Sequence, residues 1–453
     1  MSRRDRTVAL ITLSLLQVFT LAAASAVVNL TPPQADDPRP PSVAGRALVQ
    51  PAPALPALGD LAQPPSASAL AARLADLAKD AKPRISAVVV DVDTGRVLFD
   101  RDAQRPSIPA STTKLVTSVA ALSALGPGHR ITTKVVQGGD GGIVLVGGGD
   151  PTLTARTSAY GAYPRYASLD DLARQTAAAL TKAGVRQVRV DYDTSLYVGP
   201  GTATGWKRNY LPDGEVAPMS ALTVDEGRTE DGGRVEDPAS DAAEKFARLL
   251  DRAGVNAKAG RRTVAPKDAP ALGAVQSPPV SALVEHLMTV SDNDVAEALI
   301  RQVAIKRKQP ASFDGGARAV MAEMRRLNLE QGIEVHDGSG LSTRNRITPL
   351  ALARLASLAA SDAHPELRPA LTGMPVAGFT GTLAAPRYTG ETAAGAGTVR
   401  AKTGTLSGVS TLAGVVQDAR GRLLAFAFML GDGEGPVEPR RLDRLAAAVA
   451  ACC

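Results

Sequence analysis

Ser111 and Lys114 lie three positions apart at the start of an apolar segment. In a helix this spacing places both side chains on one face. The first turn of a helix offers free N–H groups and a positive potential, which stabilise a neighbouring oxyanion. A desolvated lysine with a lowered pKa can take the proton of a serine hydroxyl and make it a nucleophile. The pair therefore indicates acyl-transfer chemistry, although S-x-x-K alone also fits a capping serine beside a surface lysine.

Two further short motifs carry polar side chains that could hold a substrate. Ser291-Asp292-Asn293 precedes an apolar helical segment, and Lys402-Thr403-Gly404-Thr405 opens a strand-like segment. Alone, the first motif fits a helix N-cap and the second an edge strand. The glycine of the second motif permits close approach of a ligand backbone. Together and in this chain order, S-x-x-K, S-[DN]-N and K-T-G form the signature of the serine penicillin-recognising enzymes.

The sequence resembles the D-alanyl-D-alanine carboxypeptidases/endopeptidases of the class C low-molecular-mass penicillin-binding proteins. The likeness extends from Ile85 to Leu430 and includes four further segments: LVGGGDPTL at 145–153, APMSAL at 217–222, DGSGLS at 337–342, and PVAG at 375–378 with GTL at 381–383. This family inserts extra domains between its first two motifs. The gap between Lys114 and Ser291 is shorter than in members with two inserted domains, so we expect one inserted domain or a trimmed pair.

The resemblance implies an α+β fold of the serine β-lactamase/penicillin-binding (transpeptidase-like) type. An antiparallel sheet is flanked by helices, and an α/β domain is inserted between the S-x-x-K and S-x-N motifs. Three catalytic residues follow from the same resemblance: Ser111 as the nucleophile, Lys114 as its base, and Ser291 as a proton relay to the leaving amine. It implies no metal and no cofactor.

The resemblance also assigns substrate-binding residues. Asn293 would hold a substrate amide, and Arg344 would contact an acidic group of the substrate, although a solvated arginine is the simpler explanation. The substrate's terminal carboxylate would be held by the third motif, Lys402, Thr403, Gly404 and Thr405. The oxyanion hole would consist of the backbone N–H groups of Ser111 and Thr405.

The implied activity is that of a serine D-Ala-D-Ala carboxypeptidase, with or without endopeptidase activity, on peptidoglycan stem peptides. Its acyl-enzyme would form on Ser111, and β-lactams would be covalent inhibitors. Three alternatives stay open: a β-lactamase or esterase on the same fold, a catalytically silent wall-binding scaffold, and a Ser-His-Asp hydrolase. The last has only His336-Asp337-Gly338-Ser339 in its favour, because the sequence contains no G-x-S-x-G.

The elements that must position these motifs follow from hydrophobic periodicity and turn signals. At the two ends of the folded chain we expect a hairpin over 85–92 and 97–100, a helix over 111–122, helical structure over 280–300, strands at 399–402, 410–417 and 423–430, and a closing helix over 439–451. In the middle we expect strands at 143–146 and 188–191, and helices at 169–183 and 241–253 capped by Ser168 and Ser240. This predicts a discontinuous catalytic domain, 67–130 with 271–453, around an insertion at 131–270.

Composition excludes several other classes. Of the 453 residues, 44% are hydrophobic, which rules out a wholly disordered chain. Only 3% are aromatic and the net charge is +6 without a concentrated patch, so nucleic acid is not an expected partner. The only cysteines are Cys452 and Cys453, which excludes thiolate zinc sites. The four histidines are scattered without an HExxH motif, which argues against a metal enzyme.

The N-terminus has the pattern of a targeting segment. Residues 1–30 combine three arginines with an apolar stretch and a small-residue site at Ala24-Ser25-Ala26. The stretch fits either a cleaved signal peptide or, as we favour, a retained single membrane anchor. Ten prolines over 31–66 predict an extended tether. Because positively charged residues that flank a membrane segment stay on the cytoplasmic side, we expect the folded part outside the cytoplasm, in the cell envelope. The sequence indicates no oligomeric state.

Overall fold

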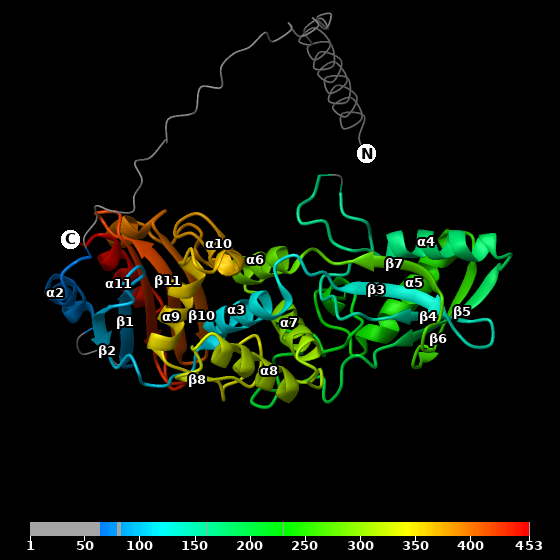
Figure 1. The fold of residues 1–453 in the computed structure, drawn as a ribbon, viewed down its shortest axis with the longest axis horizontal. Helices are drawn as coiled ribbons and strands as arrows, with labels where there is room; N and C mark the ends of the chain where they lie inside the picture. The colour runs from blue at the N-terminus through cyan, green and yellow to red at the C-terminus, as the bar shows by residue number, and fades with distance from the viewer. Residues whose placement is uncertain (1–63, 79–82, 160, 230, 453) are drawn as a thin grey trace, which may run out of the picture. The chain divides into compact units, whose positions relative to one another are not determined.

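The structure is a computed structural model that describes residues 64–78, 83–159, 161–229 and 231–452 (Figure 1). The predicted leader and nearly all of the predicted tether lie outside these residues. The chain divides into two units, 1–57 and 58–453, and every described element belongs to the second. None of the helices in this described part has the length and apolar character needed to cross a membrane.

The two ends of the folded chain meet in a five-stranded antiparallel sheet of order β10-β11-β12-β1-β2. Its strands are β1 (Ile85–Asp91), β2 (Val97–Arg101), β10 (Val399–Leu406), β11 (Val409–Gln417) and β12 (Leu423–Leu430). β1 pairs with β12 from Ile85 opposite Leu430 onward. All seven residues of β1 are buried, because helices cover both faces of this sheet. The run of β-branched and apolar residues in β1 is typical of such a doubly covered strand.

Helices on the two faces of this sheet bury separate apolar clusters. One face packs against α2 (Ala67–Ala78) and α11 (Arg440–Ala450). The other face packs against a helical layer: α3 (Thr113–Leu125), α6 (Val280–Val290), α7 (Asn293–Lys306), α8 (Phe313–Arg326), α9 (Pro349–Ala360) and the short α10 (Arg368–Thr372). Almost every residue of α3 is buried, so this helix runs through the core and has no solvent face.

A second five-stranded sheet of order β6-β5-β4-β3-β7 forms from the middle of the chain. Its strands are β3 (Thr132–Gln137), β4 (Ile143–Val146), β5 (Gln187–Asp193), β6 (Asn256–Arg262) and β7 (Ala271–Gln276). β4, β5 and β6 are parallel, and the chain crosses between them through α4 (Leu169–Lys182) and α5 (Pro238–Arg252). Figure 1 shows both helices beside this sheet. The pairing of β7 with β3 continues the sheet past the expected boundary at residue 270.

Two helix boundaries differ from the sequence-based expectation. α5 begins at Pro238 rather than Asp241, because the Asp237 carboxylate accepts the N–H groups of Ala239 and Ser240 and takes the capping role expected for Ser240. The helical structure expected over 280–300 breaks at Ser291, which has a φ of 65° and ends α6. This break matters for the site, because it turns Ser291 out of both helices. A small sheet of β8 (Ile333–Glu334) and β9 (Arg346–Ile347) completes the strands.

Candidate active site

Ser111 lies in a 3₁₀ turn, Ala110–Thr112, that leads directly into α3. Lys114 is in the first turn of α3 and its side chain is fully buried. Its Nζ lies 3.0 Å from Ser111 Oγ, 2.7 Å from Asn293 Oδ1 and 2.8 Å from the carbonyl oxygen of Ser339. Ala110, just before the serine, has a φ of 47°, a backbone conformation that non-glycine residues adopt mainly under constraint. The turn therefore presents Ser111 to a lysine held by three acceptors.

The second motif spans the break between α6 and α7. Ser291 ends α6 in the left-handed region, and Asp292 caps α7 by accepting the N–H of Val295. Asn293 begins α7 and points its carbonyl oxygen at Lys114. The motif is thus a helix N-cap, the simpler of the two functions that its sequence suggests. It also brings the side chains of Ser291 and Asn293 into the site.

The third motif lies on β10, at the edge of the first sheet. The Lys402 side chain is fully buried and its Nζ donates to Ser291 Oγ at 2.9 Å and to the Thr403 carbonyl at 2.9 Å. A Cβ added at Gly404 would lie 2.9 Å from the backbone nitrogen of Ser111, so only glycine lets the strand approach the serine turn this closely. β10 therefore runs beside the turn that carries Ser111, and its Lys402 reaches Ser291 at the end of α6.

Burial changes the protonation of both lysines. It lowers the pKa of Lys114 to about 8, because the ammonium group loses its hydration, while nearby carboxylates such as Asp337 and Glu297 oppose the change. Burial also lowers the pKa of Lys402 well below its usual range, and the charge of Lys114 acts in the same direction. A lysine with a pKa near 8 is partly neutral at physiological pH, which a general base requires.

A buried carboxylate holds the loop that supplies the third acceptor for Lys114. Glu297 on α7 is fully buried and accepts the N–H groups of Gly338 and Ser339. Burial, reinforced by the negative charge of Asp337, raises the pKa of Glu297 to about 7. Asp337 in turn accepts the N–H groups of Gly340 and Ser342. Hydrogen bonds to two carboxylates therefore hold the 337–342 loop in the shape that sets the position of the Ser339 carbonyl.

A loop from the middle of the chain also reaches the site. Asn293 Nδ2 donates to the Glu215 carbonyl at 2.8 Å, which orients the amide so that its oxygen faces Lys114. One residue further, Asp294 accepts the N–H of Ala217 and pairs with Arg234 at 2.9 Å. The segment between β5 and α5 is therefore joined to the start of α7 by polar contacts, and those of Asp294 are buried.

The structure brings together Ser111, Lys114, Ser291, Asn293 and Lys402, with Thr403, Gly404 and Thr405 on the adjoining strand. Arg344 is different: its side chain is exposed and has no hydrogen bond or ion pair to other described residues. His336 faces Glu334 at 3.2 Å rather than Ser111. Lys114, not an imidazole, is the basic group beside the serine, which disfavours the Ser-His-Asp alternative.

Sequence reasoning missed the groups that hold Lys114. The Ser339 carbonyl is a backbone atom with no side-chain signature, and it lies 225 positions from the lysine. In the sequence the DGSGLS segment is a point of family likeness and does not indicate contact with Lys114. Glu297 lies four positions after Asn293 on the same helix. An acidic residue at such a position usually belongs to a solvent-exposed helix face, so the sequence does not mark it as part of the site.

Gly340 offers a test of how closely the 337–342 loop fits the serine turn. Its φ is 86°, and an added Cβ would lie 1.9 Å from the carbonyl oxygen of Ala110. We expect Gly340→Ala to lower the unfolding temperature and to slow acylation of Ser111, the predicted nucleophile, because the clash displaces the preceding residue, Ala110. Thermal unfolding and the rate of labelling by a fluorescent penicillin measure the two effects.

Gly126→Ala is the matched control, because Gly126 has the same φ of 86° but no atom within 4 Å of the added Cβ. It should cost only the backbone strain of about 1–3 kcal/mol and leave the labelling rate unchanged. Equal effects of the two substitutions on labelling would contradict the predicted contact.

Comparison with known proteins identifies the family of this chain. The D-Ala-D-Ala carboxypeptidase 3 (S13) family matches residues 67–232 and 230–451. The chain is 37% identical to a carboxypeptidase of Mycobacterium tuberculosis over 92% of its own length and 90% of that protein's. It is 38% identical to carboxypeptidase DacB of Mycolicibacterium smegmatis, over 85% and 84%.

The fold resembles that of a solved structure. The crystal structure of penicillin-binding protein 4 (dacB) from Haemophilus influenzae aligns with a TM-score of 0.66 over 84% of this chain and 97% of that one, at 21% identity. The predicted α+β fold of the penicillin-binding type and the predicted family resemblance are both confirmed. The chain therefore belongs to the D-Ala-D-Ala carboxypeptidase 3 (S13) family.

Proposed function

We propose that this chain is a serine D-Ala-D-Ala carboxypeptidase that acts on peptidoglycan stem peptides through an acyl-enzyme on Ser111. One observation carries the proposal: the fully buried Lys114 places its Nζ 3.0 Å from Ser111 Oγ, in a chain of this family. Burial supplies the lowered pKa that a lysine base needs.

Acylation follows from these contacts. Neutral Lys114 takes the hydroxyl proton as Ser111 Oγ bonds to the carbonyl carbon of the penultimate D-alanine. Backbone N–H groups of Ser111 and Thr405 stabilise the oxyanion; one such donor contributes about 3 kcal/mol. Ser291, held by Lys402, gives its hydroxyl proton to the leaving amine as the C–N bond breaks and D-alanine departs. Ser291 recovers a proton from Lys114, which returns that lysine to its neutral form. Water then hydrolyses the acyl-enzyme.

The same elements bind the substrate. Lys402 supplies a hydrogen-bond donor at β10. The Thr403 hydroxyl shares a 2.7 Å hydrogen bond with that of Thr382, which orients it for the terminal carboxylate. Thr405 adds a second hydroxyl, and the Asn293 amide holds a substrate amide. Arg344, whose side chain is exposed, contacts an acidic group of the stem peptide. β-Lactams acylate Ser111 in the same way and block it.

The proposal includes the organisation of the chain. The catalytic domain comprises 67–130 and 277–453, with the boundary moved past β7, and 131–276 form one inserted domain. Residues 1–30 serve as a signal peptide or a single membrane anchor, and 31–66 as a tether to it. The family's substrate chemistry and the leader together support an extracytoplasmic location in the cell envelope.

Release of D-alanine from a stem pentapeptide by the full chain tests the proposal. We expect release by wild type and none by Ser111→Ala. Cleavage of cross-linked muropeptides by the same preparation measures endopeptidase activity. Steady turnover of nitrocefin without D-alanine release would favour the β-lactamase alternative, and absence of both activities would favour the scaffold.

The pKa of Lys114 predicts how acylation depends on pH. The base is the neutral form of Lys114, whose pKa is about 8. At pH 7 about one tenth of the enzyme therefore carries Lys114 in the neutral form that can accept the proton. We expect the second-order rate of acylation by a fluorescent penicillin to rise about tenfold per pH unit well below pH 8 and to level off above it.

His336→Gln provides the control for this profile, since the imidazole faces Glu334 and not the serine. The variant should follow the wild-type curve. A histidine base would instead place the inflection near pH 6.5, and an inflection that His336→Gln removes would overturn the assignment of Lys114.

A further inference from the structure

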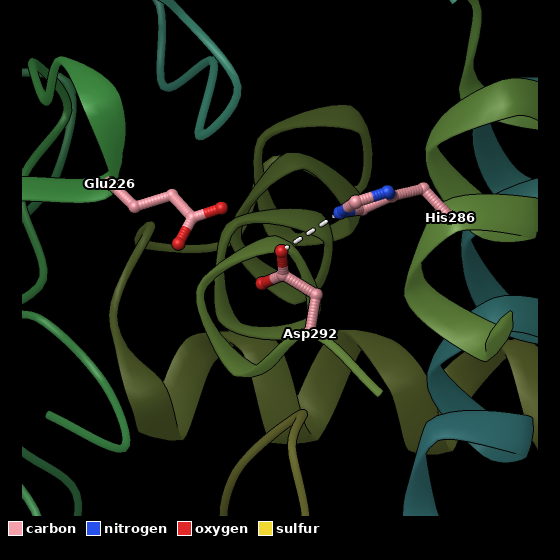
Figure 2. Close-up of side chains that lie close together, drawn as sticks. All are labelled: Glu226, His286 and Asp292. Atoms are coloured by element: carbon pink, nitrogen blue, oxygen red, sulfur yellow. Dashed lines mark hydrogen bonds and ion pairs between the residues drawn. The ribbon is translucent and has the colours of Figure 1, made fainter. Parts of the chain in front are cut away.

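We propose that Glu226, His286 and Asp292 form a divalent-cation site whose donor set suits Zn²⁺. The three side chains come from different parts of the chain and point toward one another (Figure 2). Glu226 lies in the short 3₁₀ turn Asp225–Gly227, His286 on α6, and Asp292 at the cap of α7. One donor atom from each lies within 4.8 Å of the other two.

The donor set has the chemistry of a zinc site. It offers one imidazole nitrogen and two carboxylate oxygens, all of which are zinc ligands, and water can fill the fourth position. A tetrahedral ion with ligand bonds of about 2.0–2.2 Å holds its donor atoms about 3.4 Å apart, so side-chain shifts of about 1 Å complete the site. His286 Nε2 and Asp292 Oδ2 are hydrogen-bonded to each other at 3.1 Å. An ion that replaces the shared proton would require these two atoms to separate by only about 0.3 Å.

The hydrogen bonds of each side chain leave the required atom available. Asp292 uses Oδ1 to accept the N–H of Val295, so Oδ2 is the atom that faces the site. Glu226 accepts from Arg228 at Oε2, and its Oε1 has no hydrogen-bond partner among the described residues. On His286, Nδ1 lies 3.4 Å from the Tyr166 hydroxyl, an outer contact that fixes the ring and directs Nε2 toward the two carboxylates.

Two arginines near Glu226 do not prevent cation binding. The Arg228 side chain is 49% exposed, and exposed ion pairs of this kind contribute little stability. A bound ion can therefore displace Arg228 from Glu226 with little loss of folding free energy. Arg234 is paired with Asp294 at 2.9 Å, and its distance to Glu226 Oε2 is longer, 3.7 Å. An adjoining cavity of about 230 Å³, lined partly by Tyr166, Glu226 and His286, provides a route for a hydrated ion.

The third ligand distinguishes this cluster from other histidine–carboxylate pairs. His336 with Glu334 and His364 with Glu366 form pairs at similar distances, but neither has a third ligand within reach among the described residues. Because Asp292 lies between Ser291 and Asn293, a bound ion would join the loop that carries Glu226 to the segment that carries two residues of the proposed active site. The 60 positions between Glu226 and His286 explain why no ligand spacing was visible in the sequence.

Zn²⁺ titration of the full chain tests the proposal, with a chromophoric chelator as competitor. We expect one ion per chain in wild type, and affinity at least about tenfold lower in His286→Gln and in Glu226→Gln. His336→Gln is the matched control and should bind as wild type does. Asp292 is not substituted, because it also caps α7. Thermal unfolding without metal verifies that each variant is folded.

Co²⁺ gives a second readout that does not depend on activity. Bound to wild type, it should produce the visible absorption of a four-coordinate nitrogen–oxygen site, and this band should be lost in His286→Gln. The proposal is overturned if wild type binds no stoichiometric Zn²⁺, or if folded His286→Gln binds as tightly as wild type. Because binding is measured directly, a failure of the proposed carboxypeptidase activity leaves this test intact.

Discussion

Ser111→Ala should abolish covalent labelling by penicillin and lower D-alanine release to the background rate. The substitution removes the atom that forms the acyl bond in the proposed mechanism, so we expect a loss of about 10⁶ in kcat, as found when a catalytic serine nucleophile is removed. Gel fluorescence after labelling and a D-alanine assay on the pentapeptide measure the two effects. The unfolding temperature should change little, because Ser111 contributes only a partly exposed hydroxyl to the fold.

Ser118→Ala is the matched control for this substitution. Ser118 is a buried serine on α3 whose hydroxyl has no hydrogen-bond partner among the described residues. Removing an unsatisfied buried hydroxyl should be neutral or slightly stabilising and should leave labelling intact. Labelling of Ser111→Ala at the wild-type rate would mean that another residue is the nucleophile.

The sequence predicts the parts of the site that depend on local structure. An apolar period follows both S-x-x-K and S-x-N and predicts a helix start at each motif, and α3 and α7 do begin there. K-T-G was placed on a strand, and β10 contains it. The apolar runs of β1, β11 and β12 likewise predicted the first sheet, since a strand buried on both faces leaves a continuous hydrophobic pattern.

Features that depend on tertiary contact could not be predicted. The sequence predicts helical structure over 280–300, with S-x-N just before its second part. The left-handed turn at Ser291 occurs without glycine or proline, so nothing in the sequence marks the conformation of the break. The capping role of Asp237 was missed because Asp237 and Ser240 both suit the position, and only the backbone path decides between them. The partners of Lys114 on the 337–342 loop become neighbours only when the helical layer has packed.

Lys114→Met should lower the acylation rate by about 10²–10⁴, the usual contribution of a general base. Methionine retains most of the aliphatic volume of the lysine but has no group that accepts the Ser111 proton. It also leaves Asn293 Oδ1 and the Ser339 carbonyl without the donor they share. Lys134→Met, at an exposed position on β3, is the control and should label as wild type does.

The pH profile separates a base from a merely structural lysine. If Lys114 is the base, the residual acylation of Lys114→Met should show no inflection near pH 8, because the group whose pKa is about 8 has been removed. If Lys114 only held Asn293 and the 337–342 loop in place, the variant would lose rate at every pH and retain the inflection. Acylation rates measured from pH 6 to pH 10 on both proteins distinguish the two outcomes, and a retained inflection would assign the proton transfer to another group, with Lys402 next to Ser291 the first to test.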